Sequence, residues 1–197
     1  MSCSGCGSEV PAPLRMCGSC LRRDLGVYPR LAPGAVPSGA LCKEDALEFC
    51  VRPGQAVGFR SEREVGPLPY LRRGIPTDGR IDVVWYCPTK NLPIIAIEVE
   101  GRDVAKDSIR NDVGKFRSLR ARRNALVLFQ VENDSARPKR EAGKREGYAR
   151  RASVELARLG FESAEVLLDT ELFVAGGVEK WIQSVHATWT SSLTVPT

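Results

Sequence analysis

Three acidic residues on two neighbouring apolar segments have the types and spacing that could do chemistry. Glu98 and Glu100 end the segment 93–100, and Asp82 lies in the preceding apolar run 80–86. Side chains alternate between the faces of a strand, so the two glutamates share a face, and a tight connection brings Asp82 beside Glu98. Buried carboxylates repel one another unless a cation neutralises them. Because Mg²⁺ and Mn²⁺ prefer oxygen ligands, we expect Asp82 and Glu98 to hold a divalent metal.

An alternative without a metal uses the arginines that lie near these acids in the sequence. Ordinary ion pairs with arginine would also neutralise three carboxylates. The candidates for such pairs are Arg80, Arg102 and Arg110.

Four N-terminal cysteines form a second pattern with a chemical meaning. The chain has seven cysteines, an odd number, so a complete disulfide framework would leave one thiol over. The first four read C-x2-C-x10-C-x2-C, a spacing that lets four thiolates converge on one ion, and soft sulfur ligands in that geometry select zinc. We expect a structural zinc site with no open position, and the alternative is a redox dithiol pair or unrelated thiols. The ligands are Cys3, Cys6, Cys17 and Cys20.

Positive charge is concentrated in the segment 102–151. This segment holds 15 Lys and Arg against 7 Asp and Glu, a balance of +8, whereas the whole chain carries +5. Such a segment is typical of a protein that binds phosphate backbones, and the alternative is a solvated, arginine-rich helix. The expected nucleic-acid contacts are Arg117, Arg120, Arg122, Arg123, Lys139 and Arg140.

A chain of 197 residues forms one main domain with a small appendage. We expect a zinc-binding module over 1–28, a linker rich in proline over 29–40, and an α/β domain over 41–197. Hydrophobic residues make up 43% and charged residues 27%, which excludes a disordered or fibrous chain.

The elements that position the acids follow from hydrophobic periodicity. Apolar runs predict strands, and apolar residues recurring every three or four positions predict amphipathic helices. The resulting fold is a mixed central sheet flanked by helices, with the first two strands antiparallel and segment 60–79 a hairpin or a loop. Strands are expected over 80–86, 93–100, 125–131 and 161–168, and helices over 43–51, 103–122, 140–159 and 178–189.

Asp82, fifteen intervening residues, and then Glu98-Val99-Glu100 before Gly101 and a basic helix resemble the motif of the PD-(D/E)xK nuclease superfamily. The resemblance covers about 41–131 and implies a restriction-endonuclease-like core. It implies that the Asp and the first Glu hold a metal that activates water. The last motif position is usually Lys, but some restriction endonucleases resemble this chain in having Glu there. A looser resemblance to very-short-patch repair endonucleases lacks their histidine.

The missing motif lysine leaves the proton transfer open. Glu100 acts as base or second metal ligand, or a lysine from the following helix reaches in. On a helical wheel Lys106 lies about 80° to one side of Phe116 and Lys115 about 100° to the other, so only one can face the acids. We favour Lys106 because it is nearer to the strand end. Glu44 or Glu48 would add a carboxylate if the resemblance extends to the first helix.

Two classes of function fit these patterns. The first is a magnesium-dependent endonuclease of restriction or repair type that hydrolyses phosphodiester bonds, with double-stranded DNA as its partner. The second is a non-catalytic nucleic-acid-binding protein with a nuclease-like fold. The longest apolar run, 92–97, is too short to span a membrane, so we expect a cytoplasmic protein with no membrane partner. Formation of a homodimer to cut both strands is left open.

Overall fold

The computed structural model describes residues 43–56, 58–101, 104–129, 142–168 and 180–185. The expected zinc module over 1–28 and the linker over 29–40 lie outside these residues. Lys139 and Arg140, two of the expected nucleic-acid contacts, also lie outside them.

A five-stranded mixed sheet forms the centre of the described fold, with the strand order β1-β2-β3-β4-β5. The first three strands are antiparallel, whereas β4 is parallel to β3 and β5 is parallel to β4. This arrangement confirms the mixed α/β sheet and the antiparallel pairing of the first two expected strands. The strands are β1 (Arg60–Arg72), β2 (Ile75–Tyr86), β3 (Pro93–Gly101), β4 (Arg123–Phe129) and β5 (Glu165–Leu168).

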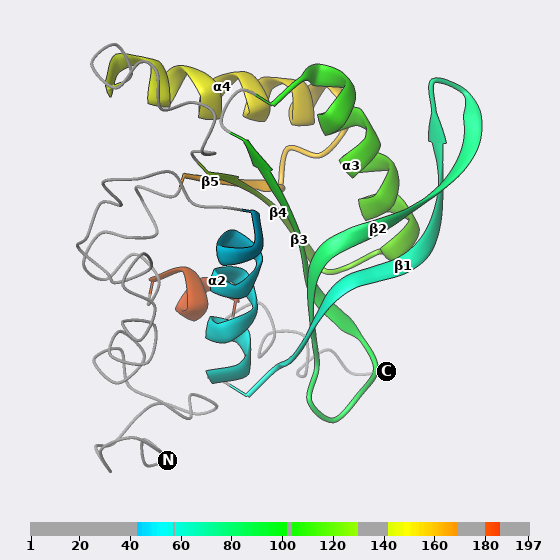
Figure 1. Ribbon diagram of the computed structural model, residues 1–197, viewed down its shortest axis with the longest axis vertical. Coiled ribbons are helices and arrows are strands. Elements are labelled where there is room, and N and C mark those ends of the chain that lie inside the picture. The colour runs from blue at the N-terminus through cyan, green and yellow to red at the C-terminus, as the bar shows by residue number, and fades with distance from the viewer. Residues whose placement is uncertain (1–42, 57, 102–103, 130–141, 169–179, 186–197) are drawn as a thin grey trace.

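Helices cover both faces of the sheet (Figure 1). Helix α2 (Lys43–Ala56) packs on one face, and α3 (Lys106–Leu119) and α4 (Ala142–Arg158) pack on the other. Because β3 and β4 are parallel, the chain must cross from one end of the sheet to the other between them, and α3 makes this crossing. No described helix is long and apolar enough to cross a membrane.

Alternation along β3 divides its side chains between the two faces. Ile95, Ile97 and Val99 join the apolar cluster under α2, whereas Ala96 joins a cluster with Phe116 of α3. The α2 side is rich in aromatic rings. They include Trp85, whose indole lies 5.1 Å from that of Trp181 and donates a 2.9 Å hydrogen bond to the carbonyl of Cys50. The face of β3 that points away from α2 is therefore the one that carries Glu98.

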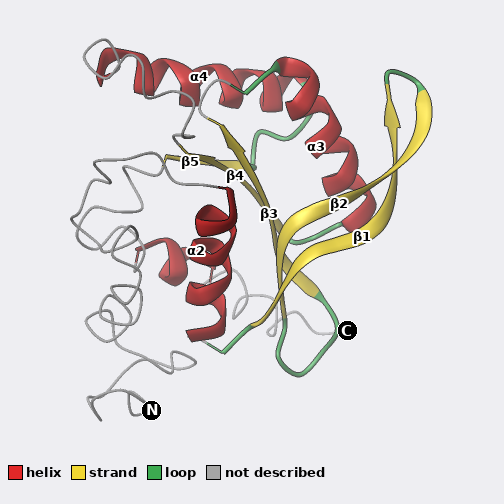
Figure 2. Cartoon of the chain, in the orientation of Figure 1, coloured by secondary structure: helices red, strands yellow, loops and turns green. Residues whose placement is uncertain are grey.

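The segment expected to be a hairpin or a loop is a long hairpin. Strands β1 and β2 are paired from Arg60↔Tyr86 to Arg72↔Ile75, and the far end of the hairpin extends beyond the rest of the sheet beside α3 (Figure 2). The second strand therefore begins at Ile75 instead of Arg80. The apolar pattern predicts only the buried half of β2, because the outer half of the strand is largely exposed.

Several other boundaries differ from the expected ones for local reasons. Helix α2 continues through Pro53 to Ala56, beyond the expected end at Val51. Helix α3 ends at Leu119 because Arg120 adopts a left-handed conformation, with φ 55°, and its N–H caps the carbonyl of Phe116. Strand β5 is limited to 165–168, since the preceding residues form a turn.

Candidate active site

Asp82 and Glu98 lie side by side at the point where the pairing of β2 and β3 ends. The last regular pair is Val83↔Ile97, and the next step along both strands brings Asp82 level with Glu98. The N–H of Val99 donates a 2.8 Å hydrogen bond to Oδ2 of Asp82. Both acids are buried. The side chain of Asp82 thus continues the interaction between the two strands and is fixed by it.

Lys115 from α3 reaches the buried carboxylate of Glu98. Its Nζ lies 2.6 Å from Oε1 of Glu98 and 2.9 Å from Oδ1 of Asp112, with only 12% of its side chain exposed. The stem of Lys115 passes close to Gly79 of β2, where an added Cβ would lie 3.1 Å from Cδ of the lysine. The absence of a side chain at Gly79 therefore leaves the path by which this lysine reaches the acids.

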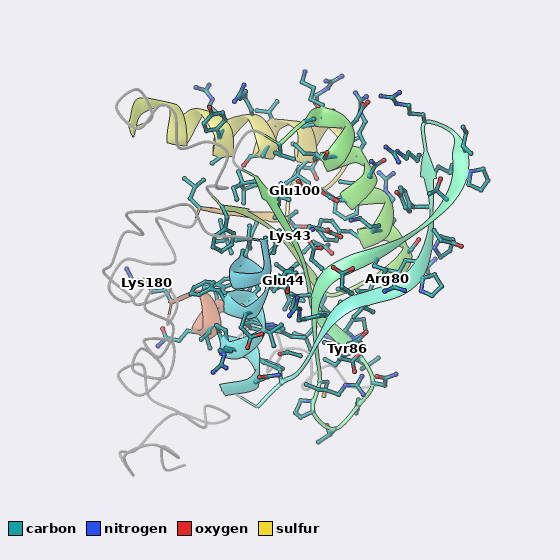
Figure 3. All side chains as sticks on the ribbon, viewed as in Figure 1. Lys43, Glu44, Arg80, Tyr86, Glu100 and Lys180 are labelled. Atoms are coloured by element: carbon teal, nitrogen blue, oxygen red, sulfur yellow. The ribbon has the colours of Figure 1, made fainter. Side chains whose placement is uncertain are left out.

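Lys43, the first residue of α2, approaches the same acids from the other side of the sheet. Its Nζ lies 3.0 Å from Oδ1 of Asp82, and 56% of its side chain is exposed. Figure 3 shows Lys43 near Glu100, the last residue but one of β3. Glu100 is half-buried. The cluster is therefore closed on the side of Lys115 and open to solvent on the side of Lys43.

Burial and mutual repulsion favour the protonated forms of the acids. Burial raises the pKa of Glu98 well above its usual range, and the charge of Asp112 raises it further, although Lys115 opposes both effects. Burial, with Asp112, also raises the pKa of Glu100 to about 7. Burial lowers the pKa of Lys115, but the two carboxylates raise it more, so the net shift is upward. Lys115 is therefore a fixed cation, but the lysines around these carboxylates are too few to neutralise all of them.

The charge count quantifies this deficit. Four carboxylates face two lysines, so the fully ionised cluster carries −4 + 2 = −2. In addition, Oδ2 of Asp112 is buried without a hydrogen-bond partner within the described structure. The carboxylates are Asp82, Glu98, Glu100 and Asp112. A deficit of this size matches one divalent cation.

The residues fit a metal held by few protein ligands. Within the residues that the structure describes, no group of three or more His, Cys, Asp or Glu side chains is arranged to hold an ion. Magnesium, however, commonly uses one or two carboxylates and completes its octahedron with water and substrate phosphate. Asp82 and Glu98 match that pattern in donor type and charge.

The structure brings Lys115, and not Lys106, to the acids. Lys106 is exposed at the first residue of α3, and among the described residues it makes no ion pair with Asp82 or Glu98. Proximity in sequence to the strand end therefore does not identify the lysine that contacts the acids. The chain must first leave the sheet before α3 turns back across it, so a residue in the third turn lies closer to the acids.

Asp112 was missed by the sequence reasoning, although a signal for it exists. On the helical wheel it lies about 40° from Phe116, on the same flank as Lys115, so it belongs to the buried face. An acid three residues before a lysine on a buried face indicates a polar cluster. The structure confirms its burial, with 2% of Asp112 exposed.

The arginines proposed as alternative partners of the acids do not fill that role where the structure describes them. Arg110 pairs with Asp107 and with buried Glu155 of α4. Arg80 is exposed on β2. Arg102 lies outside the described residues.

The two glutamates of the first helix pair with arginines. Glu44 pairs with Arg63 of β1, and Glu48 pairs with Arg52 one helical turn away. These two acids are therefore ion-paired side chains of α2, apart from the cluster that Lys43 joins.

The expected nucleic-acid contacts that the structure describes lie at the other end of the sheet. Arg123 begins β4, where it pairs with Glu165 and donates to the hydroxyl of Ser184. Arg117 donates to the carbonyl of Leu159 and lies over the ring of Phe161. Arg120 and Arg122 are exposed in the turn between α3 and β4. Arg117, Arg120 and Arg122 are all exposed, and Arg117 is the one whose guanidinium is held by these contacts.

Comparisons of the chain with family models, with curated proteins and with solved structures find no match. The residues of the site therefore carry what is known of the function of this chain.

Proposed function

We propose that this protein is a magnesium- or manganese-dependent endonuclease that hydrolyses phosphodiester bonds in double-stranded DNA, in the manner that the resemblance to PD-(D/E)xK nucleases implies. The observation that carries the proposal is the position of Asp82 and Glu98. They lie together at the end of two paired strands, with Lys115 against Glu98 and an excess of negative charge around them. We also propose that it acts in the cytoplasm.

Each residue of the cluster has a distinct role in this proposal. Asp82 and Glu98 would hold the metal, which supplies Lewis acidity to the phosphate and to the attacking water. Lys115 keeps its proton and provides a fixed positive charge for the negative charge that develops on the phosphate. Asp112 holds Lys115 in place through a 2.9 Å contact. Glu100, whose pKa is raised to about 7, can accept a proton near neutral pH.

A second candidate function follows from the lysines themselves. Lys43 and Lys115 already form ion pairs with Asp82, Glu98 and Asp112. A protein that only binds nucleic acid could keep such a cluster as a set of buried ion pairs that stabilise the end of the sheet. This non-catalytic alternative predicts binding without cleavage.

Cleavage of a supercoiled plasmid tests the proposal. The parent is expected to nick or linearise the plasmid in Mg²⁺ or Mn²⁺ and not in EDTA. Asp82→Asn and Glu98→Gln should each lower the single-turnover rate by about 100-fold or more, because each removes a metal ligand. Glu162→Gln, an exposed acid in the turn that precedes β5, is the matched control and should cleave like the parent. Binding with no cleavage in either metal would favour the non-catalytic alternative.

We further propose one structural zinc ion held by Cys3, Cys6, Cys17 and Cys20. The support is the spacing of these cysteines in the sequence. Metal analysis of reduced protein should find one zinc per chain, and Cys17→Ser with Cys20→Ser should abolish it. Zinc content unchanged by these substitutions would rule out the assignment. This cysteine variant keeps Asp82 and Glu98, so loss of zinc can be distinguished from loss of the magnesium site.

A further inference from the structure

The tip of the β1–β2 hairpin carries two large aliphatic side chains in water. Leu71 is 65% exposed and Ile75 is 67% exposed, the highest values among the large hydrophobic residues that the structure describes. The strands pair Leu71 with Pro76 on one face and Ile75 with Arg72 on the other, so each face of the tip carries one of the two exposed aliphatic side chains. Exposed apolar groups gathered at one protruding point indicate a contact site.

Positive charge surrounds this apolar tip. The hairpin segment 66–80 contains three arginines and one acid, a balance of +2. Arg72 is exposed at the end of β1, and Arg80 is exposed farther along β2. An apolar tip with flanking arginines is complementary to a nucleic-acid duplex, which presents stacked bases between two lines of phosphate.

The hairpin is anchored on α3 and so presents its tip in a defined position. The side chain of Tyr70 packs against Gly114 of α3, where an added Cβ would lie 2.9 Å from Cβ of the tyrosine. The hydroxyl of Ser118 donates to the carbonyl of Pro69, and Arg73 pairs with Asp107 in the first turn of α3. An anchored hairpin loses little conformational entropy on binding, which favours its use as a rigid contact element.

The same helix links the tip to the acid cluster. Asp107, which holds Arg73, and Asp112, which holds Lys115, are five residues apart on α3, or about 7.5 Å along its axis. Figure 2 shows the hairpin extending beside α3. A duplex that contacts the tip is therefore held in a fixed relation to the acids.

We propose that the hairpin 66–80 is a DNA-contacting wedge. Leu71 and Ile75 press against a base step of the duplex, and Arg72 and Arg80 bind the flanking phosphates. The choice of DNA rests on the proposed function, whereas the existence of a contact at the tip rests on the exposed side chains and their charge.

Binding of a fluorescently labelled DNA duplex by the full chain tests the wedge, with EDTA present so that no strand is cut. Leu71→Ser with Ile75→Ser should weaken binding about tenfold and leave the salt dependence unchanged, because apolar contact is lost and no charge is removed. The matched control is Leu92→Ser with Val154→Ser, two other exposed aliphatic residues, which should bind within about twofold of the parent. Arg72→Gln with Arg80→Gln should flatten the salt slope by about 1.8.

A base analogue whose fluorescence rises on unstacking gives a second readout of the wedge. Its signal should rise when the parent binds and should not rise with the Leu71 and Ile75 variant. Equal affinities for this variant and its control would overturn the proposal. The proposal would also be overturned if the parent self-associates in sedimentation and the Leu71 and Ile75 variant does not, with DNA binding unchanged. That result would assign the tip to contact with a second copy of the chain.

The outcomes separate the wedge from the endonuclease. A parent that binds DNA through the tip but never cleaves the plasmid would retain the wedge and refute the nuclease. A parent that cleaves, while the tip variant binds as tightly as the parent, would retain the nuclease and refute the wedge. A parent that binds no duplex at low salt would refute the wedge whatever its cleavage result.

Discussion

The two ends of strand β3 use charge in opposite ways. At its carboxyl end, Glu98 and Glu100 belong to a buried cluster in which acids outnumber the two lysines. At its amino end, Ile95 pairs with Arg123, whose guanidinium is matched by Glu165 and Ser184. The carboxyl end therefore lacks positive charge, whereas at the amino end the charge of Arg123 is balanced by its partners.

Function is therefore expected where charge is left uncompensated. The arginines are dense in the sequence, but they lie on a helix end, in a turn and at a strand start, where Arg117 contacts Leu159 and Arg123 pairs with Glu165. Ile95 and Glu100 are five residues apart on one strand, or about 17 Å, so these arginines do not line the acid cluster. Density of charge in the sequence gave a poorer indication of the site than the register of the strands.

The largest expected difference is between the two lysines of α3. Lys115→Met should lower the cleavage rate by about 100-fold, because it removes the cation beside Glu98 while keeping the length of the apolar stem. Lys106→Met is the matched control and should cleave within about twofold of the parent. Single-turnover rates in Mg²⁺ give the measurement. If Lys106→Met were the slower variant, Lys106 and not Lys115 would be the lysine that acts with the acids.

At the amino end of β3, the salt dependence of DNA binding distinguishes arginines that bind phosphate from an arginine that stabilises the fold. Arg120→Gln with Arg122→Gln should flatten the salt slope of DNA binding by about 1.8, if both exposed arginines neutralise phosphates. Arg123→Gln should leave that slope unchanged and instead lower the free energy of unfolding by about 1–3 kcal/mol, since Glu165 loses its partner. Binding titrations at several salt concentrations and chemical denaturation measure the two effects. A changed slope for Arg123→Gln would show that this arginine also meets the DNA.

The shortage of positive charge around Glu100 should make the free energy of unfolding depend on pH. The pKa of Glu100 is raised to about 7, so between about pH 4.5 and 7 the folded chain holds a proton that the unfolded chain has lost. Without metal, the free energy of unfolding should therefore fall as the pH rises through this range. Glu100→Gln should flatten the fall, and Glu162→Gln, an exposed acid, should not. A profile that is unchanged by Glu100→Gln would remove Glu100 from the cluster.

The smallest expected effect concerns Lys43, which competes with a cation for Asp82. Lys43→Gln should lower the Mg²⁺ concentration needed for half-maximal cleavage by about two- to fivefold, because one oxygen of Asp82 loses its exposed lysine. A metal titration of the cleavage rate measures this shift. A rise in the required Mg²⁺ would instead show that Lys43 assists the reaction.

The sequence was sufficient to predict the elements with strong local patterns. Alternation along 93–100 predicts that Glu98 lies on the face opposite Ile95, Ile97 and Val99, and the structure places those three residues under α2. The antiparallel pairing of β2 and β3 followed from two adjacent apolar runs. The sequence does not distinguish a hairpin from a loop over 60–79, because the outer half of the hairpin is exposed and carries no apolar period. Its stability comes from contacts with α3, which are distant in sequence.

The composition of the acid cluster was only partly predictable for the same reason. The helical wheel of α3 places Lys106 and Lys115 on opposite sides of Phe116, but it does not show which side faces the end of β3. That choice depends on how the helix crosses the sheet, and a distant residue, Gly79, leaves room for the lysine stem. The contact between Lys43 and Asp82 joins the two sides of the sheet and has no local signature.

Gly79 also limits how this chain can change in evolution. An added Cβ there would lie 2.7 Å from the ring of Tyr70 and 3.1 Å from the stem of Lys115, so even alanine would disturb two elements at once. The exposed tip of the hairpin can vary its side chains to suit a new partner without meeting this restriction. The surface of the hairpin is thus free to diverge while its base, tied to the lysine of the acid cluster, is held to the smallest residue.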